Sequence, residues 1–424
     1  MHYNKALSGL FLGLLGLATL ADAAEPLENL PYAVAGGTPN LDLRLRYENV
    51  DQELGAGSAE QASAFTLRSR LGYSTGKWNG LDAQLEFENL TAIGQDDYNS
   101  TENSGMAAYP VVADPEGSEL NQAWIRYAGP AKTTAKLGRQ RLIFDNARFI
   151  GNVGWRQREQ TYDALLLSNS FLPKLTFDYA YLGNVNSFRS FVIDGKPSTN
   201  RDIEGQLLHL SYDYAKSLKL SAYDYLLDFQ PPLAPDSSPS ADSQTWGLRA
   251  SGNLPHGALS FSYALEYAQQ SDYADSTGVV DADYQLIELG LEAKPAGIKL
   301  GYEKLGGDGS YAFQTPLATL HAFQGWADMF LVTPANGLQE LYLSLSGKLE
   351  KVALMARWSQ FSADAVDGDY GSELDLQATR PLGSQLTAGL KYAAYYGQDA
   401  APVTGVSPIK GDVDKAWAWL EYKF

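Results

Sequence analysis

The stretch Asp414–Phe424, DKAWAWLEYKF, carries the clearest structural signal in the chain. Small, aliphatic and aromatic side chains occupy one parity, from Ala416 to Phe424, and charged side chains and tryptophans occupy the other. Successive side chains of a β-strand point to opposite faces, so this period of two predicts a strand with one apolar face. An exposed apolar strand invites aggregation unless its sheet is covered or closed into a barrel.

The same alternation recurs along the chain, as in LDLRLRY (Leu41–Tyr47), where Asp42, Arg44 and Arg46 share one face. Further examples are 65–73, 81–87, 259–267, 341–347 and 352–358. Short connections lie near residues 76, 129, 215, 254, 295, 350 and 381. Long ones, richer in Gly, Pro, Asn, Ser and acidic residues, cover 51–60, 92–118, 145–160, 184–202, 229–242, 270–282, 306–337, 363–371 and 397–413. Tight turns at one rim and long loops at the other are typical of a transmembrane antiparallel β-barrel. Nine long loops predict 18 strands, with both termini on the short-turn, periplasmic side.

The first 23 residues have the pattern of a secretory signal peptide. Lys5 precedes an apolar run from Leu7 to Leu20, and Ala21-Asp22-Ala23 fits a cleavage site. The run is shorter than the ~20 residues of a spanning helix. We therefore predict a signal peptide (1–23), an N-terminal periplasmic segment (24–40) and a barrel (41–424). A soluble β-sandwich is the alternative. The signal peptide, the loop asymmetry and a final strand that resembles those of bacterial outer-membrane barrels favour the outer membrane of a Gram-negative bacterium.

Arginine is concentrated in the first half of a chain whose net charge is -18, because ten of the 15 arginines lie between residues 44 and 158. The residues predicted to line the pore are Arg44, Arg46, Arg68, Arg70, Arg126, Arg139, Arg141, Arg156, Arg158 and Asp163. A positive lumen would favour anions, and the guanidinium fork suits planar carboxylates. Acidic residues such as Glu48 and Glu86 on the same strands allow another interpretation, in which opposed charges brace the wall without selecting a solute.

The connection 306–337 is the longest, and its segment TPLATLHAFQGWADMF (315–330) is too apolar for a free extracellular loop. Loops of this length are usually functional. We predict that it folds into the barrel mouth and narrows the pore, with Phe323 and Trp326 packed on the wall. A lid outside the barrel, or a packing element at its rim, is the alternative.

Enzymatic chemistry has little support in this sequence. Only His209, His256 and His321 follow the predicted cleavage site, and no Ser-His-Asp spacing or metal-ligand cluster accompanies them. A glycine-rich phosphate cradle and a basic nucleic-acid face are also missing from the sequence pattern. We predict a protein that is not an enzyme, with no cofactor, no metal and no nucleic-acid partner.

Three segments resemble the alginate-export family of outer-membrane barrels: LGRQRLIFDN (137–146), GWRQREQTYDAL (154–165) and residues 313–343. The similarity extends from about Leu41 to Phe424. It implies an 18-stranded monomeric barrel, and the founding member exports the anionic polysaccharide alginate through an arginine-rich constriction. By this resemblance Arg139 and Arg141 match the family's Gly-Arg-Gln-Arg strand. Arg156 and Arg158 lie where the family brings charge toward the pore, with Asp163 just inside the next strand.

Together these features predict a passive outer-membrane channel for anionic solutes, first of all alginate-like uronate polysaccharide or oligosaccharide. The alternative is a general or substrate-specific porin for small solutes, in which the lumen arginines are structural. The predicted partners are outer-membrane lipid, lipopolysaccharide and an anionic carbohydrate. Transport direction and any periplasmic partner are left open by the sequence.

Overall fold

The computed structural model describes residues 29–52, 58–102, 106–193, 196–230, 242–276, 278–397 and 411–424. The predicted signal peptide (1–23) lies outside the described residues. The predicted periplasmic segment is described from residue 29, and it contains the short helix α1 (Leu30–Ala35). No helix among the described residues is long and apolar enough to cross a membrane.

The rest of the described chain is β-structure. The strands are β1 (Thr38–Gln52), β2 (Gln61–Ser74), β3 (Leu81–Asp97), β4 (Gly117–Ala128), β5 (Thr133–Gln140), β6 (Thr161–Asn169), β7 (Leu175–Ile193), β8 (Lys196–Ala215), β9 (Leu218–Leu227), β10 (Phe229–Gln230), β11 (Ser243–His256), β12 (Leu259–Asp272), β13 (Asp281–Ala293), β14 (Ala296–Leu305), β15 (Leu338–Leu349), β16 (Val352–Ser362), β17 (Asp369–Pro381), β18 (Leu386–Gly397) and β19 (Val413–Lys423). β10 continues β9 beyond Asp228, and both pair with β8. The described chain therefore forms 18 antiparallel barrel strands.

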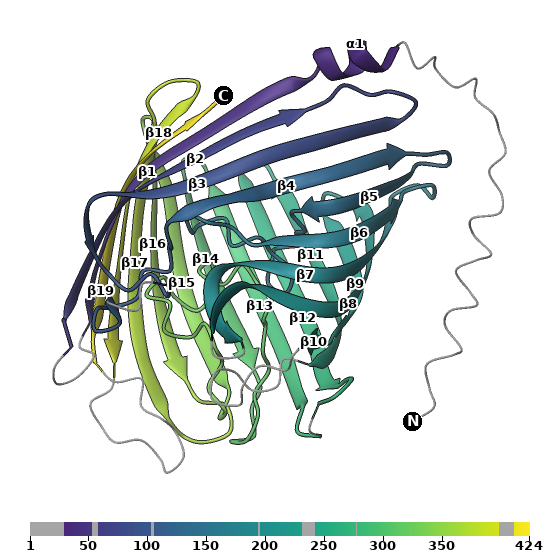
Figure 1. Cartoon of the computed structure of the whole chain (residues 1–424). Coiled ribbons are helices and arrows are strands. Elements are labelled where there is room, and N and C mark those ends of the chain that lie inside the picture. Colours follow the sequence, from purple (N-terminus) through teal and green to yellow (C-terminus); the bar gives the residue numbers. More distant parts are fainter. Residues whose placement is uncertain are drawn as a thin grey trace.

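The sheet closes between its first and last strands (Figure 1). β1 pairs with β2 on one side and with β19 on the other, so that Leu45 lies opposite both Leu67 and Leu420. Closure leaves no unpaired edge, which a strand-based membrane protein requires because lipid offers no hydrogen-bond partners. The predicted 18-stranded barrel is confirmed.

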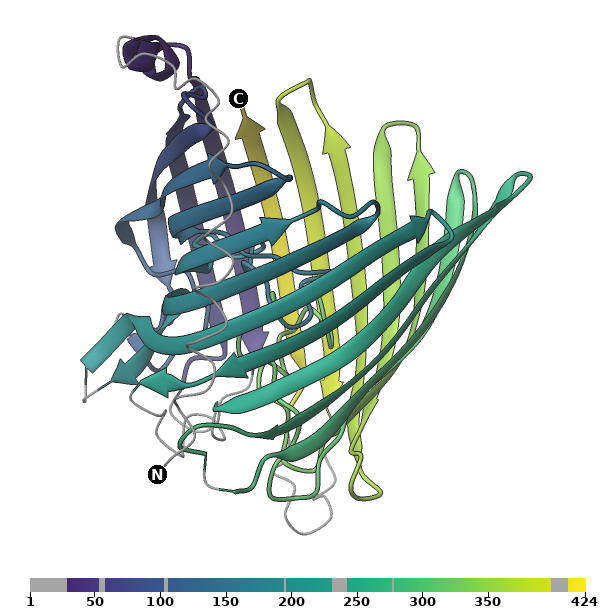
Figure 2. The same cartoon turned by 90° about the vertical axis from the view of Figure 1, so that its right-hand side faces the viewer.

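The two rims differ as the sequence predicts. Eight turns of two to six residues join the strands at the rim that carries α1 and the C-terminus, and the long connections lie at the opposite rim (Figures 1 and 2). One predicted loop was wrong. Residues 184–202 belong almost entirely to β7 and β8, which are joined at 194–195. These strand ends pair with each other as a long ribbon and need no apolar face. Their sequence is therefore polar and resembles that of a loop.

Burial alternates along the strands, since polar side chains such as Arg46 and Glu48 are buried inside while Leu341, Leu343 and Leu345 are exposed outside. An apolar outer face and a polar inner face match the demands of lipid and water. The buried apolar side chains gather between the wall and two long connections that fold inward. These connections are called the first inner loop (141–160) and the second inner loop (306–337).

Candidate functional site in the barrel lumen

Two short strands bring the first inner loop into the lumen. β5 has 8 residues and β6 has 9, whereas the neighbouring β7 and β8 have 19 and 20. The first residue of β6, Thr161, pairs with Asn186, so β7 extends seven residues beyond it, roughly 23 Å at about 3.3 Å per residue. The first inner loop leaves the wall at this level. Its contacts with β1, β9 and β14 show that it crosses the barrel interior.

Asp145 and Arg148 fix the first inner loop to two other parts of the wall. Asp145 accepts hydrogen bonds from Nε2 of His209 at 2.8 Å and from the hydroxyl of Ser221 at 2.7 Å. Burial alone would raise the pKa of Asp145, but these partners lower it to about 2. Arg148 donates to Glu303 on β14 at 2.7 Å and to Thr315 of the second inner loop at 2.9 Å. Arg148 therefore joins both inner loops to the wall.

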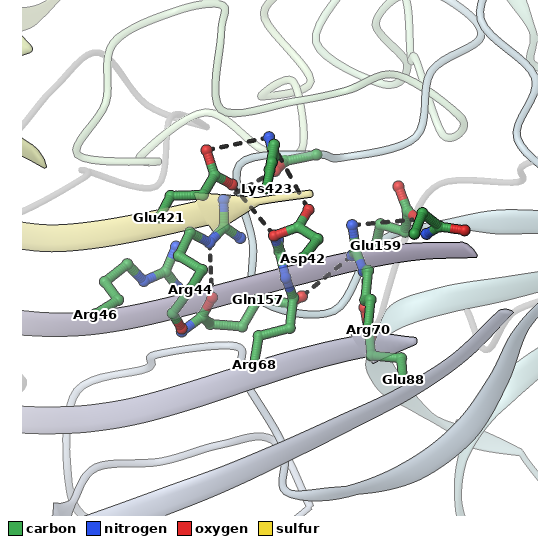
Figure 3. A network of polar contacts seen from close by, with 12 residues as sticks. Asp42, Arg44, Arg46, Arg68, Arg70, Glu88, Gln157, Glu159, Glu421 and Lys423 are labelled. Atoms are coloured by element: carbon green, nitrogen blue, oxygen red, sulfur yellow. Dashed lines mark hydrogen bonds and ion pairs between the residues drawn. The ribbon is translucent and has the colours of Figure 1, made fainter. Parts of the chain in front are cut away.

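Arg44 and Arg46 of β1 hold the other end of this loop (Figure 3). Nε of Arg44 donates to the side-chain oxygen of Gln157 at 2.8 Å, and Nη1 of Arg46 donates to the carbonyl of Trp155 at 2.7 Å. Nη2 of Arg46 pairs with Asp114 from the connection 98–116. Both guanidinium groups are buried. Their N–H groups donate to loop carbonyls, to a side-chain amide and to a carboxylate.

Glu159 links the first inner loop to two further arginines. Arg141 donates to Glu159 at 2.6 Å and to Glu86 of β3 at 2.8 Å. Arg70 pairs with Glu88 and lies 3.5 Å from Glu159 (Figure 3). Burial alone would raise the pKa of Glu159, but Arg70 and Arg141 lower it to about 2. The cluster therefore alternates positive and negative charges.

Arg156 is the centre of the network. It donates to Glu48 of β1 at 3.0 Å and to Asp328 of the second inner loop at 2.6 Å. Burial alone would lower the pKa of Arg156, but Glu48 and Asp328 raise it above its ordinary value, so the group stays charged. One buried side chain thus connects the wall to both inner loops.

Two predicted pore arginines pair within the wall, without contacting an inner loop. Arg68 donates to Asp42 at 2.5 Å and to Glu421 at 3.2 Å, which ties β2 to β1 and β19. Arg126 forms a bidentate pair with Asp82 at 3.0 and 2.7 Å. The side chain of Arg126 is 42% exposed. It is the most exposed of the predicted pore arginines, although it too is paired.

The remaining predicted residues lie apart from this network. Arg139 forms a bidentate pair with Asp163, its register partner on β6, at 2.7 and 3.0 Å. Arg158 donates to the carbonyl of Glu116 at 3.0 Å. The register of β5 is continuous with both neighbouring strands. Gly138 has a φ of 122°, which residues with a side chain rarely adopt.

The second inner loop packs inside the barrel against β17 and β18. Trp326 is buried, and the ammonium of Lys391 lies 3.5 Å from the centre of its indole ring. Glu373 of β17 accepts a hydrogen bond from the backbone N–H of Ala327 at 2.8 Å. Phe323 is half-buried, and the guanidinium of Arg148 lies 4.8 Å from its ring centre. The loop thus occupies the lumen instead of forming an outer lid.

His321 forms a buried hydrogen-bond relay at the base of this loop. Its Nδ1 lies 2.8 Å from Asp328, and its Nε2 lies 2.7 Å from Nζ of Lys391. A neutral ring with its proton on Nδ1 satisfies both contacts, because it donates to the carboxylate and accepts from the ammonium. Burial, followed by the nearby Lys391, lowers the pKa of His321 well below its ordinary value, although Asp328 opposes the shift. The indole of Trp155 stacks on the ring at 5.0 Å.

Acid should loosen the second inner loop. A released His321 regains a pKa of about 6.5, so below that pH the released state binds a proton that the docked state excludes. The stabilisation that neutral His321 gives to the docked loop is therefore fully present above this pH. It falls by about 1.4 kcal/mol per pH unit below it. Hydrogen exchange of residues 321–330, corrected for intrinsic rates, should accelerate from pH 7.5 to 5.5. The His321→Gln variant keeps both hydrogen bonds without titrating and should lack this response; an equal response in both proteins would contradict the relay.

An open cavity of about 640 Å³ remains beside the inner loops, against β11 to β16. Its lining includes Phe323, Tyr342, Asn253, Ser262, Ser344, Ser346, Arg249, Lys299 and Arg357. Each of the three cations has a carboxylate partner, and the pair of Lys299 with Glu288 spans 2.8 Å. The cavity offers paired charges, hydroxyl groups and two aromatic rings.

Sequence reasoning missed several residues that the structure makes central. Arg148, Trp155 and Gln157 hold the first inner loop, and Lys391 contacts the second. The tryptophan in GWRQREQ gave a signal, because a fully solvated loop rarely carries a large apolar ring; Trp155 is half-buried in the structure. Lys391 gave no such signal, because its hydrogen-bond partner His321 lies 70 positions away in the sequence.

The comparisons with known proteins agree on the architecture. The alginate-export family model matches residues 39–313. Pseudomonas aeruginosa OccK9 (OpdG) superposes with a TM-score of 0.70 at 14% identity, covering 92% of this chain and 99% of that one. Acinetobacter baumannii OccAB2 gives 0.71 at 16%, covering 92% and 98%. P. aeruginosa OpdK, solved with vanillate, gives 0.68 at 13%, covering 92% and 99%. A search of curated protein sequences finds no match.

These structural likenesses concern the fold, and the family match covers most of the chain. The closed barrel, its apolar outer face and its loop-filled lumen are those of a channel across an outer membrane. The chain belongs to the alginate-export family and is an outer-membrane β-barrel channel.

Proposed function

We propose that this channel passes small carboxylate-bearing sugars, of the size of a uronate mono- or disaccharide, through the open cavity. The arginines between residues 44 and 158 then brace the constriction that the inner loops form. Transport is passive, through a single barrel without a catalytic step or cofactor. The observation that carries the proposal is the cavity, which combines Lys299, Arg357, hydroxyl groups and the rings of Phe323 and Tyr342.

The cavity has the chemistry that a charged sugar needs. Aromatic rings pack against the C–H faces of a pyranose, and a few polar groups fix its orientation. Lys299 is 43% exposed, so a solute carboxylate can reach it beside Glu288. Arg357 lies over the ring of Tyr342 at 3.8 Å and pairs with Glu340 at 2.6 Å, which holds its guanidinium in place. The vanillate of the OpdK structure is likewise a carboxylate on a ring.

Polymeric alginate is the second candidate, and membership of the alginate-export family favours it. A polymer must thread the lumen past both inner loops. These loops are fixed by buried pairs at Arg148 and Arg156, which favours the smaller solute.

Blocking of ion current in a planar bilayer tests the proposal. A uronate disaccharide should block the wild-type channel at lower concentration than a neutral disaccharide. The Lys299→Gln variant should weaken uronate block about tenfold, the usual value of a hydrogen bond to a charged group. Lys423→Gln is the control, because Lys423 is also exposed and paired with a carboxylate, Glu421 at 3.1 Å, but lies on β19, which does not line the cavity. Equal block by both sugars would leave a general porin, and block by polymer alone would favour alginate.

A further inference from the structure

The short turns of the barrel are unusually basic for so acidic a chain. Six of the eight turns contain a lysine: Lys77, Lys132, Lys174, Lys216, Lys294 and Lys351. The eight turns together contain one acidic residue, Glu350. The remaining two turns follow β11, which ends at His256, and β17, whose last two residues are Arg380 and Pro381. The six lysines are called the lysine collar.

The opposite rim has the reverse composition. In the sequence, the eight long connections at that rim hold 16 acidic and 5 basic residues. Four of those five basic residues are the arginines of the first inner loop, which are paired inside the barrel. The charge of the chain is therefore divided along the barrel axis, with free cations at the short-turn rim. By the usual orientation of such barrels this rim is periplasmic.

The collar lysines are exposed and available. None of the six forms an ion pair with any residue that the structure describes, in contrast to the lumen arginines. Lys174 donates to the carbonyl of Tyr214 at 2.8 Å, a contact that leaves its charge uncompensated. Six unpaired ammonium groups around one rim form a surface for an anionic partner.

Exposed apolar side chains place the collar at the edge of the lipid band. Phe171 and Leu172 precede Lys174 in the same turn and are 61% and 54% exposed. Leu349, on the lipid-facing parity of β15, is 67% exposed and lies two residues before Lys351. Two strand residues span about 7 Å, so the ammonium groups stand where acyl chains give way to headgroups.

Helix α1 lies beside the lysine collar. Its side chains are exposed, with Tyr32 at 78%, although they are mostly apolar. The carbonyl of Ala33 accepts a hydrogen bond from Gly76, which neighbours Lys77, at 2.8 Å. The helix thus adds apolar surface beside a collar lysine, as interfacial anchors do.

We propose that the lysine collar binds the phosphates of anionic phospholipids in the periplasmic leaflet. The apolar residues beside the lysines face lipid and not the lumen, which favours a headgroup over a solute in transit. Each lysine near an anionic surface strengthens attraction by about fivefold, and the effect weakens with salt. The collar would hold the barrel at a fixed depth while the acidic loops face outward.

Native mass spectrometry of the full-length protein with phosphatidylglycerol and phosphatidylethanolamine tests the collar. The wild type should retain phosphatidylglycerol preferentially. Changing Lys132, Lys174, Lys216 and Lys351 to Gln should lower that preference at least about fivefold, and changing the same four to Arg should preserve it. Heat-modified gel mobility reports whether each variant folds. If the fourfold variant does not fold, Lys174→Gln and Lys351→Gln, tested singly, should each reduce the preference.

Several outcomes would overturn the collar. One is equal retention of the two lipids by the wild type, and another is an unchanged preference in the Gln variants. Loss of the preference in the Arg variant would mean that charge is not the cause. If the fourfold Gln variant keeps its lipids but admits anions less readily from the periplasmic side, the collar serves the solute instead.

Discussion

Replacing Arg156 with alanine should free the second inner loop and destabilise its docking by about 3–5 kcal/mol. Removing one partner of a buried ion pair has this cost. Glu48 then keeps Arg46 at 3.2 Å and Asp328 keeps Lys415 at 3.6 Å, so each buried carboxylate loses its closer cationic partner. Amide exchange of residues 321–330 should accelerate by a hundredfold or more at constant pH. Channel current should become larger and noisier, since a released loop no longer narrows the lumen at one fixed position.

Arg126→Ala is the matched control for this effect. Arg126 also has a bidentate carboxylate partner, but it is 42% exposed and contacts neither inner loop. Its loss should cost no more than about 1 kcal/mol and leave loop exchange unchanged. Equal exchange in the two variants would mean that Arg156 does not anchor the loop.

Replacing Gly325 with valine should displace the same loop by a different route. Gly325 has a φ of 83°, and a Cβ placed there would overlap a carboxylate oxygen of Glu373, which is held by its hydrogen bond from Ala327. The backbone strain and the overlap together should cost about 3–5 kcal/mol. The contact of Trp326 with Lys391 should be lost, so tryptophan fluorescence should shift to the red as the indole enters water.

Gly278→Val separates strain from overlap. Gly278 has a φ of 78°, but a Cβ there would meet no atom within 4 Å. This control should carry only the backbone strain of about 1–2 kcal/mol and leave the fluorescence of the second inner loop unchanged. A similar shift in both variants would show that the close approach to Glu373 does not seat the loop.

The wall of the barrel was predictable because it depends on short-range patterns. Period-two alternation, as in Leu41–Tyr47, follows from lipid on one face and water on the other. Turn and loop lengths then gave the strand number and the two rims. Residues 184–202 escaped this reasoning because strands that extend beyond the membrane no longer need an apolar face.

The interior was less predictable, since its contacts join residues far apart in sequence. The sequence showed that arginines cluster and that the segment 315–330 is apolar. It could not show that Arg156 would meet Asp328, 172 positions away, or that Arg46 would meet Asp114. Sequence reasoning assigned no role to His321 or Asp328, which lie seven positions apart. In the structure His321 links Asp328 to Lys391 of β18. Nothing in the sequence connects this strand to the loop.

Excising the second inner loop and measuring single-channel conductance tests most directly whether the inner loops form the constriction. Gly309 donates a backbone hydrogen bond to the carbonyl of Ala335 at 2.9 Å, so residues 310–334 can be removed and these two residues joined with little change in the wall. If the inner loops form the constriction, the variant should be a stable barrel whose conductance rises about twofold or more, since the narrowest section limits current. A folded variant with unchanged conductance would show that the second inner loop does not form the constriction, which would then lie elsewhere in the lumen.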